Sequence, residues 1–216
     1  MTGFFETIKT LFADYGSKLG QAIVDHTLYV LVAVAIGFTL GLLLGVLLSR
    51  VPRWSGVILP VLSIFQTIPG LVFIGVLYIC WGNTYATLSV YAMFPVLKNT
   101  YTGILAVEGK YVEAAKGCGM SRLQTLVKVE LPLAMPTIIA GLRMSAIYTV
   151  SWTVLAAMIG KGGLGEFVYQ GTTSNNNTLI LLGAIPAAIL AIVFGAVIDL
   201  LQKKVTPRGL RKEAGK

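Results

Sequence analysis

The chain has 216 residues, of which 56% are hydrophobic and only 12% are charged, and it carries a formal net charge of +8. Soluble globular domains carry about a quarter charged residues, so the composition excludes an ordinary soluble protein and predicts an all-α membrane protein. The positive charges are split among loops and a tail without a nucleic-acid-binding motif, which argues against a nucleic-acid partner.

The segment 1–25 predicts an amphipathic helix that lies along a membrane surface. Its apolar residues recur at steps of three and four, with charged residues between them. They are Phe4, Ile8, Leu11, Phe12, Tyr15, Leu19 and Ile23. The segment lacks the charged start, short apolar core and cleavage site of a removable signal peptide, so we expect Met1 to stay on the mature protein.

Five apolar windows predict five transmembrane helices, because about 20 apolar residues in a helix cross a hydrocarbon core of about 30 Å. The windows are His26–Leu48, Val57–Trp81, Thr87–Val107, Leu131–Ile159 and Thr178–Leu200. Prolines and polar residues interrupt the second and third of them, at Pro60, Thr67–Gly70, Pro95 and Lys98–Thr100. In the second window these interruptions predict a kink, next to a transport pathway or with a purely structural role.

The first window carries two further signals. Gly37, Gly41 and Gly45 form a row of small residues that lets two helix backbones approach closely in lipid, and we favour packing inside the protein over a dimer contact. His26 stands alone at the boundary of the window, which is more typical of an interfacial or hydrogen-bonded residue than of a ligand-binding one.

Lysine and arginine are distributed unevenly between the two sides of the membrane, and they collect on the cytoplasmic side of short loops. One side receives Arg50, Arg53, Lys110, Lys116, Arg122, Lys128, Lys203, Lys204, Arg208, Arg211, Lys212 and Lys216, whereas the other receives Lys9, Lys18 and Lys161. With five spans, this places the amino terminus with segment 1–25 outside and the carboxyl terminus inside. It also predicts a cytoplasmic loop at 108–130, an outer loop at 160–177 and a basic cytoplasmic tail at 201–216.

The polar segment 108–130, between the third and fourth windows, predicts a docking element. Ala114 and Ala115 keep one helical surface shallow, Gly117 and Gly119 allow the chain to bend, and Ser121 is placed to cap a second helix. Such a helix–turn–helix fits a groove on another protein.

The spacing in this loop resembles the signature of binding-protein-dependent ABC importer permeases. The pattern is Glu-Ala-Ala, three residues, Gly, nine residues, an aliphatic residue, one residue and Leu-Pro, and its positions are occupied by Glu113, Ala114, Ala115, Gly119, Val129, Leu131 and Pro132. Val129 stands where the family usually has isoleucine.

This resemblance implies a single transmembrane permease domain over 1–216. Its docking loop, with Glu113, Ala114, Ala115, Gly117 and Gly119, would seat on a cytoplasmic ABC ATPase dimer. The resemblance also implies a second permease, identical or a paralogue, and an extracytoplasmic solute-binding protein. It places the protein in the bacterial plasma membrane, with no cofactor in this chain and with ATP and Mg on the partner ATPase.

Further strings resemble the osmoprotectant branch of that family, which imports glycine betaine, carnitine and choline. They are Gln66–Gly70, Leu97–Gly103, Gly141–Ser145 and Gly160–Gly165. Importers of methionine, other amino acids, phosphonate and ergothioneine are similar in build and remain the alternatives.

A quaternary ammonium solute has no hydrogen-bond donor on its cationic end, so aromatic faces suit its path. Tyr101, Tyr148 and Trp152 are the candidates, with ordinary packing as the competing role. Lys98 and Arg143 lie within apolar windows, where we favour snorkelling or internal pairing over contact with a substrate carboxylate.

Catalysis by this chain is not expected. The sequence shows no paired acids, no metal-ligand spacing and no nucleophile with a partnering base, and Asp199 alone does not make an intramembrane enzyme. A stand-alone channel or secondary carrier is the remaining rival, but the inverted repeat and midplane ion ligands of such proteins are not evident.

Overall fold

The structure is a computed structural model that describes residues 2–159 and 162–205, and every regular element in these ranges is a helix. The first four are α1 (Thr2–Arg50), α2 (Pro52–Phe65), α3 (Gly70–Trp81) and α4 (Thr84–Leu105). A connecting segment holds α5 (Gly109–Gly117), α6 (Arg122–Thr125) and the π-helix η1 (Leu126–Glu130). The last elements are α7 (Leu131–Ala156), the 3₁₀ turn η2 (Ala157–Ile159), α8 (Leu164–Thr173) and α9 (Asn177–Val205). The all-α prediction is confirmed.

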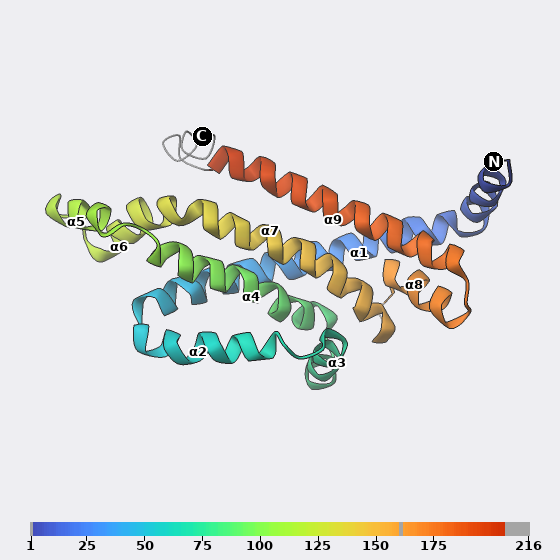
Figure 1. Ribbon diagram of the computed structural model, residues 1–216, viewed down its shortest axis with the longest axis horizontal. Helices are drawn as coiled ribbons and strands as arrows, with labels where there is room; N and C mark the ends of the chain where they lie inside the picture. The colour runs from blue at the N-terminus through green and yellow to red at the C-terminus, as the bar shows by residue number, and fades with distance from the viewer. Residues whose placement is uncertain (1, 160–161, 206–216) are drawn as a thin grey trace.

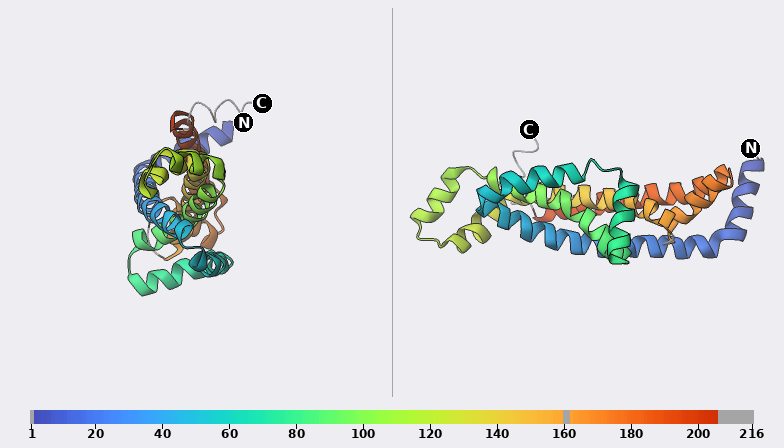
Figure 2. Two further views of the ribbon diagram at one scale, coloured as in Figure 1. Left: turned by 90° about the vertical axis from the view of Figure 1, so that its left-hand side faces the viewer. Right: turned by 90° about the horizontal axis from the view of Figure 1, so that it is seen from below.

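The helices form an elongated bundle in which α1, α4, α7 and α9 follow the long axis (Figure 1). At one end α5 and α6 project beyond the bundle, and α9 runs toward this end as it finishes. At the other end lie α8 and the start of α1, whose first turns bend away from the rest of the helix (Figure 2). The two ends of the described chain therefore lie toward opposite ends of the molecule.

The glycine row of the first window packs inside the protein, as predicted, and its neighbour is α4. A Cβ atom on Gly37 would lie 2.7 Å from Cβ of Ala92, and one on Gly41 would lie 2.7 Å from the carbonyl oxygen of Met93. A Cβ on Gly45 would come 2.6 Å from Cβ of Thr100. Since real Cβ atoms do not approach so closely, these glycines set the short distance between the two helices.

The predicted kink in the second window is a complete break. Helices α2 and α3 meet at an angle of 106°, and Pro69 stands at the N-cap of α3 with an extended ψ of 126°. Gly70 is required at the start of α3, because a Cβ there would occupy the space of the Trp152 ring.

The prediction of five membrane spans is not confirmed. Among the described residues, three helical stretches are long and apolar enough to cross a membrane, namely Tyr15–Arg50, Arg122–Ala156 and Asn177–Val205, and the bent α2–α3 pair would make a fourth. Helix α4, which covers the third predicted window, is not among these stretches because it carries polar residues such as Lys98, Asn99 and Thr102. Much of α4 is buried between α1 and α7, so its polar character belongs partly to the interior of the bundle.

The predicted surface segment 1–25 is not a separate helix, since α1 continues without interruption from Thr2 to Arg50. From Tyr15 onward this segment packs into the protein, where Leu19 and Ala22 share a buried cluster with Phe167 of α8. The side chains before Tyr15 lie outside the described part of the structure.

Candidate functional site

The docking loop turns between α5 and α6 at Gly119. The amide of Gly119 donates to the carbonyl of Lys116 (2.9 Å), and the amide of Met120 donates to the carbonyl of Ala115 (3.1 Å). These two bonds form a Schellman motif, which needs a left-handed residue at its centre. Gly119 supplies it with φ of +78°, whereas Gly117 keeps a helical conformation as the last residue of α5.

Ser121 caps α6, as the sequence predicted. Its side-chain oxygen accepts a hydrogen bond from the amide of Gln124 (3.3 Å), and its own amide donates to the side chain of Gln124 (2.8 Å). This reciprocal capping box fixes the direction in which the chain enters the second helix.

Helix α5 presents the signature residues to the outside. Glu113, Ala114 and Gly117 are exposed, while Ala115 is buried and anchors the helix to the rest of the loop. The Glu113 carboxylate has no hydrogen bond or ion pair to any other described residue. Nearby, the Lys110 ammonium donates a hydrogen bond to the Glu108 carboxylate, which raises the pKa of Lys110. The exposed face is therefore small, polar and available to a partner.

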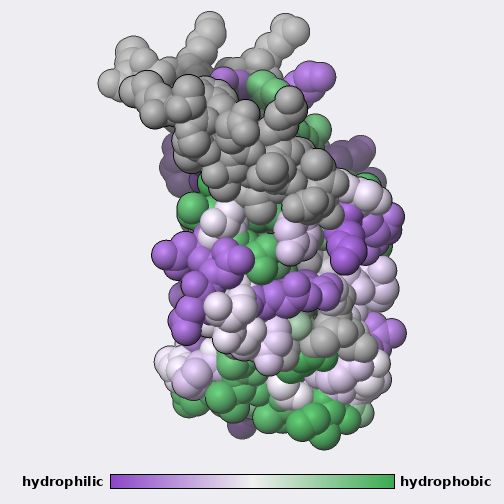
Figure 3. All heavy atoms as spheres, turned by 90° about the vertical axis from the view of Figure 1, so that its right-hand side faces the viewer, coloured by the Kyte–Doolittle hydropathy of each residue, from purple (hydrophilic) through white to green (hydrophobic). Residues whose placement is uncertain are grey.

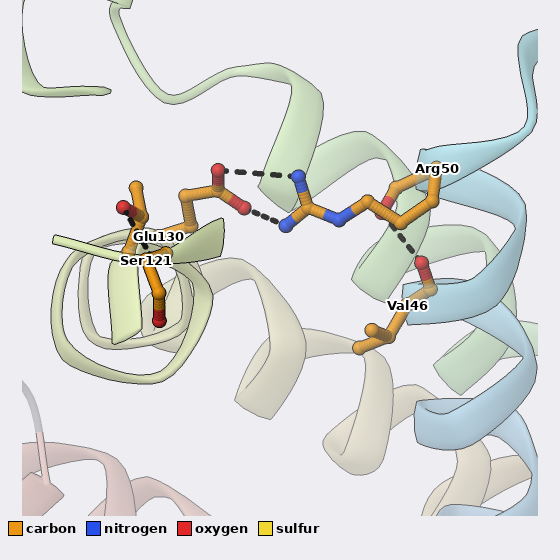
Figure 4. A network of polar contacts seen from close by, with 6 residues as sticks. Val46, Arg50, Ser121 and Glu130 are labelled. Atoms are coloured by element: carbon orange, nitrogen blue, oxygen red, sulfur yellow. Dashed lines mark hydrogen bonds and ion pairs between the residues drawn. The ribbon is translucent and has the colours of Figure 1, made fainter. Parts of the chain in front are cut away.

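A bidentate ion pair ties the docking loop to the first span (Figure 4). Arg50 is the last residue of α1, and its two terminal nitrogens donate to the two carboxylate oxygens of Glu130 at the end of η1, with a distance of 3.2 Å for Nη1 to Oε1. The Glu130 side chain is only 7% exposed. A buried carboxylate needs such a partner, because an unpaired charge away from water is costly. A movement of the loop would therefore pull on α1 through this contact.

The loop also encloses a hollow of about 600 Å³ beside this ion pair. Arg50, Lys116, Arg122 and Glu130 contribute charged groups to its lining, and Met120 and Leu123 contribute apolar ones. The hollow therefore combines positive charge with apolar surface.

The three aromatic residues proposed for a substrate path do not form one group. Trp152 packs against Tyr91, with ring centroids 3.9 Å apart, and belongs to a cluster with Phe73 and Phe94. Tyr148, one turn earlier on α7, is 45% exposed. Tyr101 donates from its hydroxyl to Ser55 of α2 (3.0 Å).

Antiparallel packing explains the separation of Tyr101 from the other two. Along the α4–α7 contact, Gly103 faces Thr137, and Ser145 donates to the carbonyl of Ala92. Tyr101 is therefore level with the first half of α7, roughly 15 Å along the axis from Tyr148 at a rise of about 1.5 Å per residue.

The two charged residues within the predicted spans, Arg143 and Lys98, differ in whether they have an ion-pair partner. Arg143 of α7 pairs with Asp199 of α9 at 2.8 Å, with both side chains about half exposed at 45%, so its expected internal pairing is found. Lys98 is exposed on α4, and its ammonium group has no ion pair or hydrogen bond within residues 2–159 and 162–205.

The opposite end of the bundle holds a second hollow, of about 310 Å³, between α1 and α8. Its polar lining consists of Lys18, Gln21, Asp25, Glu166 and Gln170. Figure 3 shows hydrophilic side chains gathered across the middle of this end, with apolar ones beneath them. Close by, His26 is fully buried and donates from Nε2 to the carbonyl of Val150 (3.2 Å), which agrees with a hydrogen-bonded rather than a ligand-binding role.

The pairing of Arg50 with Glu130 was not predicted from the sequence. Arg50 counted only as a topology signal, and Glu130 counted only as an unspecified position in the docking pattern. The signal that could have found them is a lone acid at the start of an apolar span, since such a residue needs a basic partner at the same membrane depth.

Comparison with known proteins gives the following similarities. Residues 37–210 match the family model described as binding-protein-dependent transport system inner membrane component. The carnitine transport permease protein of Listeria monocytogenes is 35% identical over 211 residues, which cover 96% of this chain and 97% of that protein. The glycine betaine/carnitine/choline transport system permease protein of Bacillus subtilis is 37% identical over 206 residues, with 94% and 95% covered.

Solved structures with the same fold include a chain of an ABC transporter. An inward-facing MetNI methionine ABC transporter contains a chain that matches with a TM-score of 0.76 at 23% identity, covering 88% of this chain and 96% of that one. At this level of identity the match concerns the fold alone.

Proposed function

The chain belongs to the family of binding-protein-dependent transport system inner membrane components, and from this premise we propose that it is the transmembrane subunit of an ATP-driven importer for a quaternary ammonium solute such as glycine betaine, carnitine or choline. The substrate class rests on relatives over nearly the whole chain whose names state carnitine, choline and glycine betaine transport. ATP with Mg would be bound by a separate ATPase.

The proposed topology has five crossings, made by α1, the broken α2–α3 pair, α4, α7 and α9. The amino terminus is outside, and α5 with α6 is cytoplasmic. Support comes from the basic residues, which favour the side of Arg50, Lys116 and Arg122. The arrangement of α5, α6 and the end of α9 at one end of the bundle agrees with it (Figure 1).

The proposed coupling runs through the docking loop. Glu113, Ala114, Ala115, Gly117 and Gly119 form the element that seats on one ATPase of a dimer, and a second permease supplies the other docking loop. Closure of the ATPases would move α5, and the Arg50–Glu130 pair would pass this motion to α1. The hollow between α1 and α8 would face the solute-binding protein on the outer side.

The test is reconstitution of the complete transporter with its ATPase and solute-binding protein, followed by parallel assays of glycine betaine uptake and ATP hydrolysis. Glu113→Lys and Gly119→Trp should lower uptake per ATP hydrolysed, because they reverse the exposed charge and strain the turn. Gly119→Asn is the matched control, since asparagine tolerates the left-handed conformation and should keep most of the coupling. Normal coupling in a stably inserted Gly119→Trp protein would contradict the docking role.

A further inference from the structure

A small hollow between α2 and α4 contains the unpaired charge of Lys98. Its volume is about 70 Å³, and Gln66, Phe94 and Thr102 line it together with Lys98. A lysine in a membrane helix usually has a partner or faces water, because a charge in lipid is costly. Arg143 satisfies this rule through Asp199, whereas Lys98 has no such partner in the described part of the chain.

The hydrogen bonds around this hollow show which of the lining side chains still have a donor group available for a ligand. Ser63 donates its hydroxyl to the carbonyl of Leu59 (3.0 Å), and Thr102 donates to the carbonyl of Lys98 (2.9 Å). The side-chain amide of Gln66 makes no hydrogen bond to any described residue. Lys98 and Gln66 are therefore the two groups in the hollow that have hydrogens to give to a ligand.

An ammonium and an amide donor suit a carboxylate. We propose that Lys98, assisted by Gln66, binds the carboxylate of a zwitterionic cargo as it passes along the α2–α4 face. This inference rests on the proposed function and adds a group that distinguishes carboxylate-bearing solutes from choline, which has none.

The hollow is a half-site. Its 70 Å³ is far below the roughly 300 Å³ of an enclosed ligand pocket. Lys98, Gln66 and Thr102 are exposed on this side of the chain, so the proposal requires a second permease to cover this face. The second permease would therefore complete the site around the cargo.

A headgroup phosphate offers the same negative charge, since Lys98 lies near the inner half of α4 and a lysine stem reaches several ångströms. Comparing the uptake of solutes with and without a carboxylate distinguishes a lipid phosphate from a cargo carboxylate as the ligand of Lys98. If Lys98 holds a lipid, its loss should lower the uptake of every solute to the same degree. If it holds cargo, only carboxylate-bearing solutes should be affected.

The experiment measures uptake of glycine betaine and of choline by the reconstituted transporter. Lys98→Met should reduce glycine betaine uptake about tenfold, the effect of losing one charge-assisted hydrogen bond, and should leave choline uptake within about twofold of the parent. Lys98→Arg should keep most glycine betaine uptake. Lys203→Met, which removes an exposed lysine near the end of α9, is the matched control and should change neither uptake.

A second arm restores the charge chemically. In a protein with Cys80 and Cys118 replaced by serine, Lys98→Cys should regain glycine betaine uptake after treatment with an aminoethyl thiosulfonate, which adds an ammonium, but not after a neutral methyl reagent. Equal losses for both solutes in Lys98→Met, no loss for either, or equal recovery with both reagents would overturn the inference. A parental transporter that moves neither solute would instead refute the proposed substrate class, and the inference with it.

Discussion

At the scale of single residues, Tyr148 and Trp152 show that spacing predicts relative position along a helix but not burial. Both lie one turn apart on α7, as the sequence indicated, yet one is half-exposed and the other packs against Tyr91. The difference arises from Phe73 and Tyr91, which reach Trp152 from α3 and α4. No local pattern in α7 indicates which of the two rings is packed by other helices. The sequence therefore predicted the position of the two aromatic residues but not their different burial.

The two aromatic residues should respond differently to truncation. Tyr148→Ala should lower choline uptake about fivefold without a loss of stability, since a cation–π contact is worth about 1 kcal/mol. Trp152→Ala should lower the free energy of unfolding by about 3 kcal/mol, because it leaves a cavity beside Tyr91. Uptake per assembled transporter and thermal unfolding in detergent measure the two effects, with Trp152→Phe as the ring-preserving control. A stable Trp152→Ala protein with impaired uptake would instead place this residue in the path.

The buried carboxylate of Glu130 should depend on Arg50. Glu130→Gln weakens the pair, and Arg50→Met leaves the carboxylate buried without its partner. We therefore expect Arg50→Met to cost about 1–3 kcal/mol of stability, below the value for a fully buried pair because Arg50 is 43% exposed. Chemical denaturation of the two single variants and of Arg50→Met/Glu130→Gln measures the coupling. Additive losses in the double variant would mean that the two residues act independently.

At the scale of helices, the glycine row and the proline-glycine break were predicted correctly in kind. The row required a close neighbour, but the sequence could not name α4, because the matching surface of Ala92, Met93 and Thr100 has no comparable pattern. Likewise, Thr67–Gly70 predicted a kink, but neither the 106° angle nor the Trp152 ring that packs over Gly70 could be predicted from this segment. The local sequence therefore predicts the glycine row and the break, but it does not predict which helices pack against them.

The contact between α1 and α4 should tolerate no added methyl group. Gly41→Ala should lower the melting temperature, since its Cβ would meet the backbone of Met93 and the Cβ of Val96 within 2.9 Å. Gly20→Ala on the same helix is the control, because a Cβ there meets nothing within 4 Å and alanine favours the helix. If the two variants melt alike, the glycine row does not determine this contact.

At the scale of the whole molecule, the membrane class and the two short helices of segment 108–130 were predicted from the sequence, whereas the five membrane spans are not confirmed. The helix α4 combines buried apolar residues with polar ones, and only the bundle around it shows why this mixture is tolerated. Of the candidate site, the turn at Gly119 and the cap at Ser121 could be predicted from local chemistry. The Arg50–Glu130 pair joins residues 80 positions apart and could not.

Labelling of cysteines tests the proposed topology. Ser174→Cys, near the turn between α8 and α9, should react with a membrane-impermeant maleimide from outside, and Cys118 should react only when the inner face is open. Both positions are exposed, and Ser174 is preferable to Asn176, whose side chain accepts hydrogen bonds from the start of α9. Cys80 is replaced by serine so that it does not contribute. The reverse labelling pattern would invert the topology.

The π-helix η1 has a consequence for how force would enter the protein. Its i→i+5 pairing places one residue more in the turn than an α-helix would, so the chain before Leu126 is rotated by about 100° relative to the axis of α7. The orientation of α6 about the axis of α7, and with it that of α5, therefore depends on backbone pairing over these five residues as well as on the capping box at Ser121. Removal of a single residue from η1 would restore an unbroken helix and rotate the exposed face of α5 by about 100° about the axis of α7, with every side chain on that face unchanged but pointing in another direction.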